Sequence, residues 1–278
     1  MVDVQAIATN VAQGDSGIWF GKERSDVSYP AAGHSICLQL EEHSFWFRHR
    51  NRCILELLRL LPPSGPLLDI GGGNGFVSCA IERAGMDVAL LEPGLEGAHN
   101  ARRRGVSTVI CSTLEDAGLL PESIHAGGLF DVLEHVEDER GFLRRVHAAF
   151  KPQGRLYLTV PARQLLWSAE DDAAGHYRRY SPGSMRAALQ GAGFDIEFLT
   201  TIFWLLPVPI FLFRSLPSRM GIRRDKELTH ARAEHLTSAG PLRAAVEWLQ
   251  SAELVAIRSR RAALFGASLL VAARKANR

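Results

Sequence analysis

Between residues 66 and 160, short apolar runs alternate with amphipathic helical segments, and this alternation constrains the fold more than any other feature. The apolar runs cover residues 66–70, 87–91, 106–111, 124–130 and 155–160. The helical segments between them cover residues 75–84, 95–104 and 137–150. Such alternation predicts right-handed βαβ units and a parallel sheet with helices on both faces. In this doubly wound α/β class, ligands bind beyond the carboxyl ends of the strands.

The residues before this region are expected to form helices and loops. Residues 1–40 contain many glycines and show little periodicity, so we expect an irregular arm with short helices. From residue 41 to residue 61 the apolar side chains follow helical spacing, and Pro62 and Pro63 end the run.

Charge and cysteine content exclude several classes of protein. Lys and Arg number 32 against 30 Asp and Glu, so the chain lacks the overall positive field that selects nucleic acid. The four cysteines show no CxxC spacing, which favours buried thiols in a reducing compartment over a zinc ribbon or a disulfide framework. We find neither a signal-peptide pattern nor the roughly 18 to 20 consecutive apolar residues of a membrane span. A cytoplasmic location is expected, and the oligomeric state stays open.

A glycine-rich turn follows the first apolar run and opens a helix. Gly71, Gly73 and Gly75 have the spacing G-x-G-x-G, preceded by the acidic Asp69. Glycines at such a turn allow the backbone to approach a ligand closely. A dinucleotide fingerprint would place its third glycine at position 76, which is Phe here, so a nicotinamide enzyme is disfavoured. An acid beside the loop suits an ammonium group, such as the methionine end of S-adenosylmethionine.

The second apolar run ends at Glu92. A carboxylate in this place can accept hydrogen bonds from both ribose hydroxyls of an adenosine, as it does in dinucleotide-binding folds. A glycine turn alone is often only a turn, and Glu92 alone could be a helix-terminal acid. Their combination with the strand context predicts that the chain binds an adenosine-type ligand.

These segments together resemble class I S-adenosylmethionine-dependent methyltransferases of the small-molecule branch. The similar blocks are LLDIGGGNG at residues 67–75, FDVLEHV at 130–136, FKPQGRL at 150–156 and FGASLLVAARK at 265–275. The resemblance implies a Rossmann-like sheet of seven strands whose last strand is antiparallel. It also implies an N-terminal helical lid and an insert before the last strand. The expected divisions are 1–64 (arm and lid), 65–200 (cofactor-binding core), 201–263 (apolar and basic helical insert) and 264–278 (closing strand).

The resemblance also assigns residues to the cofactor S-adenosylmethionine, whose product is S-adenosylhomocysteine. The methionine part would be held by Asp69, Gly71, Gly73 and Gly75, and the ribose by Glu92. Thr113 and Leu114 would lie against adenine, and Phe130 would face the cofactor from the fourth strand.

Three segments are candidates for the acceptor site. The first, Asp131-x-x-Glu134-His135, resembles a divalent-metal motif of catechol-type ubiquinone-pathway methyltransferases. The same Glu-His pair recurs in metal-free relatives, and Glu134 could simply cap the next helix. We assign no metal here and take His135 as an acceptor-side catalytic candidate.

The second segment runs from Trp167 to Tyr180 and is rich in His, Tyr and Arg. His176 could act as a general base because imidazole titrates near neutral pH. Tyr177 is a second catalytic candidate. The expected substrate-binding residues are Asp171, Arg178, Arg179 and Tyr180. The alternative is a structural loop in which the acids and arginines pair with each other.

The third segment, residues 43–51, mixes basic and aromatic side chains. Such a mixture can indicate nucleic-acid binding. A helix that packs on the sheet and closes over the pocket is favoured here, with Trp46 and His49 as further substrate-binding candidates.

The proposed insert begins with the uncharged run 198–213, which Pro207 and Pro209 interrupt, and continues with a strongly basic stretch up to Lys226. A lid over the pocket, contact with a membrane surface and a dimer contact all stay open for it. A helix is expected at residues 241–257.

Taken together, these patterns predict an enzyme that transfers a methyl group from S-adenosylmethionine to a small or lipid-like acceptor. Nucleic acid is not expected as a partner. The alternative is a non-catalytic cofactor-binding or membrane-associated scaffold.

Overall fold

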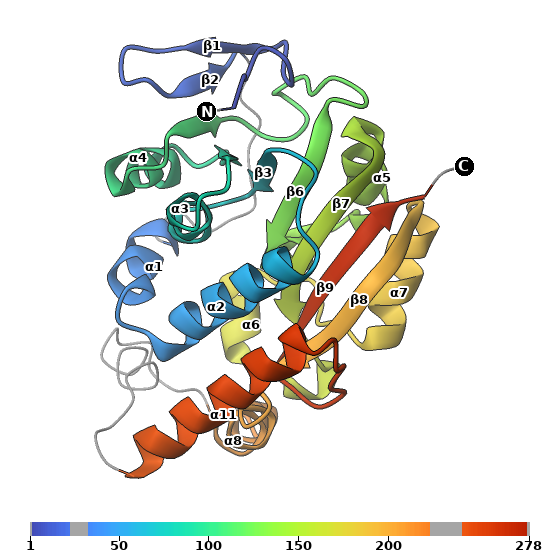
Figure 1. Cartoon of the computed structure of the whole chain (residues 1–278). Coiled ribbons are helices and arrows are strands. Elements are labelled where there is room, and N and C mark those ends of the chain that lie inside the picture. Colours follow the sequence, from blue (N-terminus) through green and yellow to red (C-terminus); the bar gives the residue numbers. More distant parts are fainter. Residues whose placement is uncertain (1, 23–32, 223–240, 277–278) are drawn as a thin grey trace.

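In the computed structural model, residues 2–22, 33–222 and 241–276 are described. They form a three-layer α/β fold around one mixed sheet (Figure 1). The strands in chain order are β1 (Val11–Gln13), β2 (Trp19–Gly21), β3 (Leu67–Ile70), β4 (Val88–Leu91), β5 (Thr108–Cys111), β6 (Ile124–Phe130), β7 (Phe150–Pro161), β8 (Phe194–Ile202) and β9 (Ser268–Lys275). The described α-helices are α1 (Gly33–Glu41), α2 (Phe45–Leu60), α3 (Phe76–Arg83), α4 (Leu95–Arg104), α5 (Glu139–Ala149), α6 (Ala169–Ala174), α7 (Pro182–Gly191), α8 (Pro207–Ile210), α9 (Leu216–Arg219) and α11 (Pro241–Arg258).

The strand order across the sheet is β1-β2-β5-β4-β3-β6-β7-β9-β8. β3 pairs in parallel with both β4 and β6, and β9 runs antiparallel between β7 and β8. The prediction of a doubly wound α/β sheet with an antiparallel last strand is therefore confirmed. Because β8 and β7 are both antiparallel to β9, the carboxyl ends of β3, β4, β6, β7 and β8 lie at one edge of the sheet.

The sheet is wider than predicted because the N-terminal arm contributes two strands. β1 and β2 form an antiparallel pair, and β2 pairs in parallel with β5. The expectation that residues 1–40 form only loops and short helices was wrong for this part. Ile18 lies fully buried in a small core with Leu90 and Val109, which anchors the arm.

Helices cover both faces of the sheet. Side chains of α2, α3 and α11 share a core with alternate residues of the central strands, such as Leu67 and Tyr157. Side chains of α5 and α7 pack on the opposite face with Leu68 and Leu156. The alternation of buried partners along each strand is that of a sheet covered on both sides.

α2 starts later than the expected residue 41. Ser44 is its N-cap, and the Ser44 side chain accepts a hydrogen bond from the Trp46 N–H. His49, Arg50 and Asn51 are buried, although a polar stretch of this kind is usually solvated.

The segment between β8 and β9 carries α8, α9 and α11, which lie at the end of the sheet where β8 terminates (Figure 1). The helix predicted at residues 241–257 is α11. Within the described ranges, no helix combines the length and apolar character needed to cross a membrane. Arg223, Arg224 and Lys226 of the basic stretch lie outside the described residues. The divisions of the chain at residues 64, 200 and 263 remain predictions.

Candidate active site

The glycine loop connects β3 to α3 at the carboxyl edge of the sheet. Gly73 has φ 54°, and apart from its chain neighbours no atom of the described residues lies within 4 Å of the place where a Cβ would be. Gly75 has φ 74°, and a Cβ there would lie 2.8 Å from Ala101. Gly75 therefore allows α3 to approach α4, whereas the loop leaves open space beside Gly73. Gly71 starts the turn, also with a positive φ.

Asp69, on β3, is 1% exposed and has one carboxylate oxygen to spare. Ser78 of α3 donates a hydrogen bond to Asp69 Oδ2 at 2.6 Å, while Oδ1 has no hydrogen-bond partner among the described residues. Burial raises the pKa of Asp69 to about 6, although the Ser78 hydrogen bond acts in the opposite direction. A buried carboxylate oxygen without a partner is rare unless a ligand completes it. An ammonium group beside the loop would do so.

Glu92 follows β4 and holds the glycine loop in place. Its Oε2 accepts a hydrogen bond from the Gly73 N–H at 2.8 Å, and its Oε1 accepts one from the Gly94 N–H at 2.7 Å. Burial raises the pKa of Glu92 to about 7 against the effect of these two bonds. Each carboxylate oxygen has a further lone pair that a ribose hydroxyl can use. His34 of α1 lies 3.5 Å from Glu92 Oε1, and no local sequence pattern predicted this contact.

The segment after β5 carries the expected adenine contacts. Thr113 Oγ1 accepts a hydrogen bond from the Asp116 N–H, and Leu114 is buried in the core. Ser112 is buried, and its hydroxyl has no hydrogen-bond partner in the described structure. Ser112 is therefore a polar candidate for the adenine side that the resemblance did not assign. Phe130, at the end of β6, is buried in the core that α2 and α3 share.

The backbone bends sharply where β6 ends. Asp131 has φ 57°, a left-handed conformation that non-glycine residues adopt mainly where the surrounding structure enforces it. The Arg50 side chain of α2 donates to the Asp131 carboxylate. The Arg50 guanidinium also lies 5.0 Å from the ring centroid of Trp46 and 5.2 Å from that of Phe47. This arrangement fixes Trp46, a predicted substrate-binding residue, near the end of β6.

The two predicted catalytic histidines lie together. The ring centroids of His135 and His176 are 4.7 Å apart. His176 Nδ1 is 2.8 Å from Asp171 Oδ1, and Arg179 donates to both oxygens of Asp171. Burial would raise the pKa of Asp171, but the hydrogen bonds from His176 and Arg179 lower it below its ordinary value. Asp171 therefore stays ionised and orients the His176 ring.

Four residues expected to bind substrate are engaged within the protein. Asp171 is 1% exposed, and Arg179 forms a two-bond ion pair with it. The Tyr180 hydroxyl donates to Glu139, while Arg178 pairs with Glu139 and donates to the Glu137 carbonyl. These contacts agree with the alternative reading of this segment, a structural loop in which acidic and arginine side chains pair with each other. The roles of these four residues toward a substrate remain predictions. Tyr177, by contrast, is 45% exposed.

The alternative that Glu134 caps the next helix was wrong. The N-cap of α5 is Asp138, which accepts a hydrogen bond from the Gly141 N–H. Glu134 is 1% exposed, and its Oε2 has no hydrogen-bond partner among the described residues. Burial, and then the charge of Asp131, raise the pKa of Glu134 well above its ordinary value. Glu134 lies with His135 and His176 in one of two groups in the described structure whose atoms could hold a metal ion.

His49 has different contacts from His135 and His176. It is 1% exposed, and its Nε2 faces Glu253 of α11 at 2.8 Å. A direct contact between His49 and a substrate is therefore not what the geometry favours.

Similarity to known proteins agrees with this geometry. Residues 45–198 match a family of methyltransferase domains. The mitochondrial ubiquinone biosynthesis O-methyltransferase of Schizosaccharomyces pombe is 32% identical over 107 residues, which are 36% of this chain and 39% of that protein. The ubiquinone biosynthesis O-methyltransferase of Xanthomonas axonopodis pv. citri is 25% identical over 158 residues, 50% of this chain and 66% of that protein. The chain thus spans 39% and 66% of the length of these two curated relatives.

Two solved structures illustrate the shared fold. Phosphoethanolamine N-methyltransferase 2 of Haemonchus contortus, in complex with S-adenosyl-L-methionine, superposes with a TM-score of 0.55 and 18% identity, covering 93% of this chain and 62% of that one. Geranyl diphosphate C-methyltransferase of Streptomyces coelicolor A3(2) superposes with a TM-score of 0.52 and 15% identity, covering 79% and 77%. At these identities the similarity concerns the fold.

Proposed function

The chain belongs to the methyltransferase domain family, and on this premise we propose that it transfers the methyl group of S-adenosylmethionine to an oxygen atom of a small, lipid-like acceptor. The observation that carries the proposal is the unpaired oxygen of buried Asp69, on the strand that leads directly into the glycine loop. A cationic amino group is the natural complement of that oxygen. Glu92, at the neighbouring strand end, supplies the acceptor oxygens for a ribose.

The residues at the glycine loop have distinct tasks in this proposal. Asp69 holds the amino group, the loop from Gly71 to Gly75 gives the methionine part room, and Glu92 fixes the ribose. Ser112, Thr113 and Leu114 border the adenine. When bound, S-adenosylmethionine supplies an electrophilic methyl group on a positively charged sulfur. The protein contributes mainly by aligning the acceptor with that methyl group.

His176 is the proposed general base. Because its Nδ1 is bonded to Asp171, its Nε2 is the nitrogen left to accept a proton from an acceptor hydroxyl. Burial, and then the charge of His176, lower the pKa of His135 to about 4. His135 is therefore neutral at pH 7 and places no positive charge beside His176. Tyr177 lies beside this pair as a further acceptor-side candidate.

The choice of an oxygen acceptor with an apolar part has two supports. The two curated relatives described above are named as O-methyltransferases of ubiquinone biosynthesis. A cleft of about 520 Å³ between Trp204 and α11 is lined mainly by apolar side chains, among them Trp248 and Val255. Trp204 directly follows Phe203, whose ring stacks on Trp46 at 5.3 Å. An apolar tail could extend from the proposed acceptor site into this cleft.

We also propose that the insert contacts an anionic lipid surface. Exposed apolar side chains concentrate on α8, α9, the π-helical segment Phe211–Ser215 between them and the adjoining turns. We call them the insert surface: Leu205, Val208, Leu212, Phe213, Leu216 and Met220. Arg214 and Arg219 belong to the same segment. Apolar residues next to cations are typical of segments that lie in a membrane interface.

Calorimetry with S-adenosylhomocysteine tests the cofactor assignment. We expect binding of S-adenosylhomocysteine and none of NAD. Asp69→Asn, which keeps the side-chain volume, should weaken binding by roughly tenfold or more because a charged hydrogen bond is lost. Asp195→Asn, at an exposed position on β8, is the matched control. Binding of NAD, or unchanged affinity in Asp69→Asn, would contradict the assignment.

A further inference from the structure

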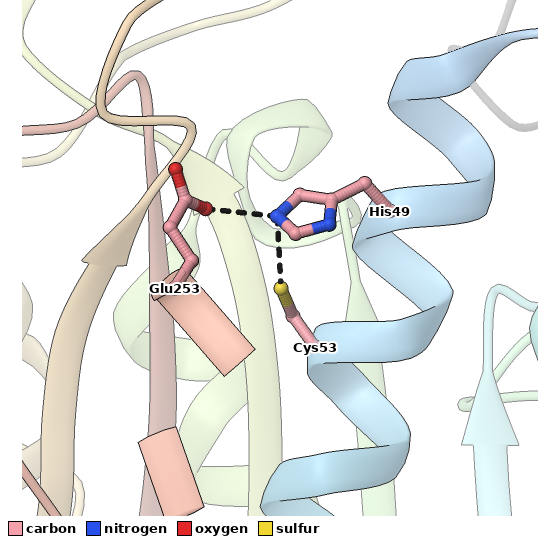
Figure 2. A group of neighbouring side chains, drawn as sticks. All are labelled: His49, Cys53 and Glu253. Atoms are coloured by element: carbon pink, nitrogen blue, oxygen red, sulfur yellow. Dashed lines mark hydrogen bonds and ion pairs between the residues drawn. The ribbon is translucent and has the colours of Figure 1, made fainter. Parts of the chain in front are cut away.

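A group of buried side chains that the proposed methyl transfer does not use lies between α2 and α11. It consists of His49, Cys53 and Glu253 (Figure 2). His49 and Cys53 lie one turn apart on α2, and Glu253 reaches them from α11. Their exposed fractions are 1%, 0% and 3%. Their nitrogen, sulfur and oxygen ligand atoms all lie within 4.8 Å of one another.

The three side chains converge on a single nitrogen. His49 Nε2 is 2.8 Å from Glu253 Oε2 and 3.4 Å from Cys53 Sγ, as Figure 2 shows. A ring nitrogen that carries a proton can donate it to the carboxylate, but it then has no lone pair for the thiol. A ring nitrogen without a proton can accept from the thiol, but its lone pair then faces the carboxylate. One N–H can therefore serve the carboxylate fully and the sulfur only as a weak, shared acceptor, whereas a cation between the three atoms would bind all three.

Glu253 is held in the orientation that such a site needs. Its Oε2 accepts a hydrogen bond from the Phe203 N–H at 2.8 Å, and its Oε1 accepts one from the Trp204 N–H at 2.7 Å. Bonds of this kind to a carboxylate ligand are usual around metal ions because they fix its direction. Both oxygens keep a lone pair for a metal ion.

We propose that His49 Nε2, Cys53 Sγ and the carboxylate of Glu253 form a structural zinc site that ties α11 to α2. A set of nitrogen, sulfur and carboxylate ligands suits Zn²⁺, which prefers four ligands in tetrahedral arrangement. The second oxygen of Glu253 or a water molecule completes the four. Spacing of four residues on one helix face, as between His49 and Cys53, places two ligands on the same ion.

The site would also order one wall of the proposed acceptor pocket. Phe203, whose N–H bonds to Glu253, has φ 61° and stacks in parallel on Trp46. Trp46 in turn lies under Arg50, the partner of Asp131. An ion at Glu253 would therefore hold the turn after β8 against α2. The proposal does not depend on methyl transfer, since the ion touches none of the proposed catalytic residues.

Metal analysis of the purified full-length protein tests the site. After dialysis against Zn²⁺ and removal of free metal, we expect one Zn²⁺ per chain by mass spectrometry of the metal content. Replacement by Co²⁺ should give the absorption band of a cobalt–thiolate bond in the unaltered chain. Chelation should lower the melting temperature. A folded chain that retains no zinc and shows no cobalt–thiolate band would overturn the proposal.

Single substitutions test whether the ion is bound by His49, Cys53 and Glu253. Cys53→Ser should abolish the cobalt–thiolate band, and both Cys53→Ser and Glu253→Gln should weaken zinc affinity by roughly tenfold or more. Cys79→Ser alters another buried thiol outside the group and should retain zinc and the band. His176→Ala tests the other possible metal group, formed by Glu134, His135 and His176. Loss of zinc in His176→Ala together with its retention in Cys53→Ser would contradict the site.

Discussion

The buried carboxyl groups of Asp69 and Glu92 have a proposed binding role, and when ionised they lower the free energy of unfolding. Burial raises the pKa of Asp69 to about 6 and that of Glu92 to about 7. Because both values are higher in the folded than in the unfolded chain, folding takes up protons. The stabilisation linked to these protons is complete at low pH and is lost as the pH rises through about 6 to 7. A ligand that carries an ammonium group and hydroxyl donors favours the ionised carboxylates and offsets this loss.

The pH dependence of cofactor affinity follows from the same two groups. We expect the affinity for S-adenosylhomocysteine to fall by about tenfold when the pH is lowered from 8 to 6, because Glu92 becomes protonated and accepts ribose hydroxyls less well. Calorimetry across this range measures the effect. Glu92→Gln should bind weakly and lose most of the dependence near pH 7. A flat profile in the unaltered chain would mean that Glu92 does not hold the ribose.

The proposed base predicts a separation of turnover from binding. His176→Ala should lower turnover by about 10²–10⁴-fold, the usual contribution of a general base, while the dissociation constant of S-adenosylhomocysteine stays within about twofold. Asp171→Asn should lower turnover in the same direction because it removes the partner that orients the His176 ring. Asp172→Asn, at the neighbouring acid, is the control. Normal turnover per folded molecule in His176→Ala would remove this residue from the site.

At the scale of single elements, strands and helices with strong local patterns were predictable from sequence. Elements that depend on pairing with a distant segment were not. β3, β4 and α4 follow from apolar runs and helical spacing over four to ten residues. β1 and β2 have three residues each, too few for a periodic signal, and form because β2 pairs with β5. The helix α6, with six residues inside the acceptor-side loop, was not predicted either.

The insert surface gives a prediction at this scale. Val208 is 55% exposed and Phe213 is 59% exposed, so replacing both with Ser should change the melting temperature little. Association with vesicles that contain anionic lipid should nevertheless decrease, because less apolar area enters the interface. Co-sedimentation measures the bound fraction. Leu95→Ser, at an exposed apolar position on α4, is the control and should bind like the unaltered chain. Equal binding by all three proteins would contradict a lipid contact through the insert.

At the scale of the whole molecule, the glycine loop, Asp69 and Glu92 could be singled out from sequence because strand ends and loop composition are local features. Contacts between distant segments produce no local sequence pattern and could not be predicted. Arg50 bonds to Asp131 across 81 residues, and His49 contacts Glu253 across 204 residues. Because the contact with Glu253 could not be predicted, His49 was expected at the acceptor. The internal pairing of Asp171 and Arg179 was likewise only one of two alternatives.

Ligand binding should stabilise the whole fold. At a concentration of S-adenosylhomocysteine 100 times its dissociation constant, the free energy of unfolding should rise by about 2.7 kcal/mol. Gly73→Val should abolish this gain, since valine opposes a φ of 54° and its side chain would occupy the open space at the loop. Thermal unfolding with and without the ligand measures the difference. A full gain in Gly73→Val would place the ligand elsewhere.

The central claim is that the chain transfers a methyl group and does not merely bind a cofactor. The most direct measurement incubates the purified protein and S-adenosylmethionine carrying a deuterated methyl group with a cell extract, and follows both products by mass spectrometry. We predict equal amounts of S-adenosylhomocysteine and of one labelled, lipid-like product, with neither formed by Gly73→Val and both strongly reduced in His176→Ala. Binding of S-adenosylhomocysteine without any transfer of label, in an extract that contains lipids, would contradict the claim and favour a cofactor-binding scaffold.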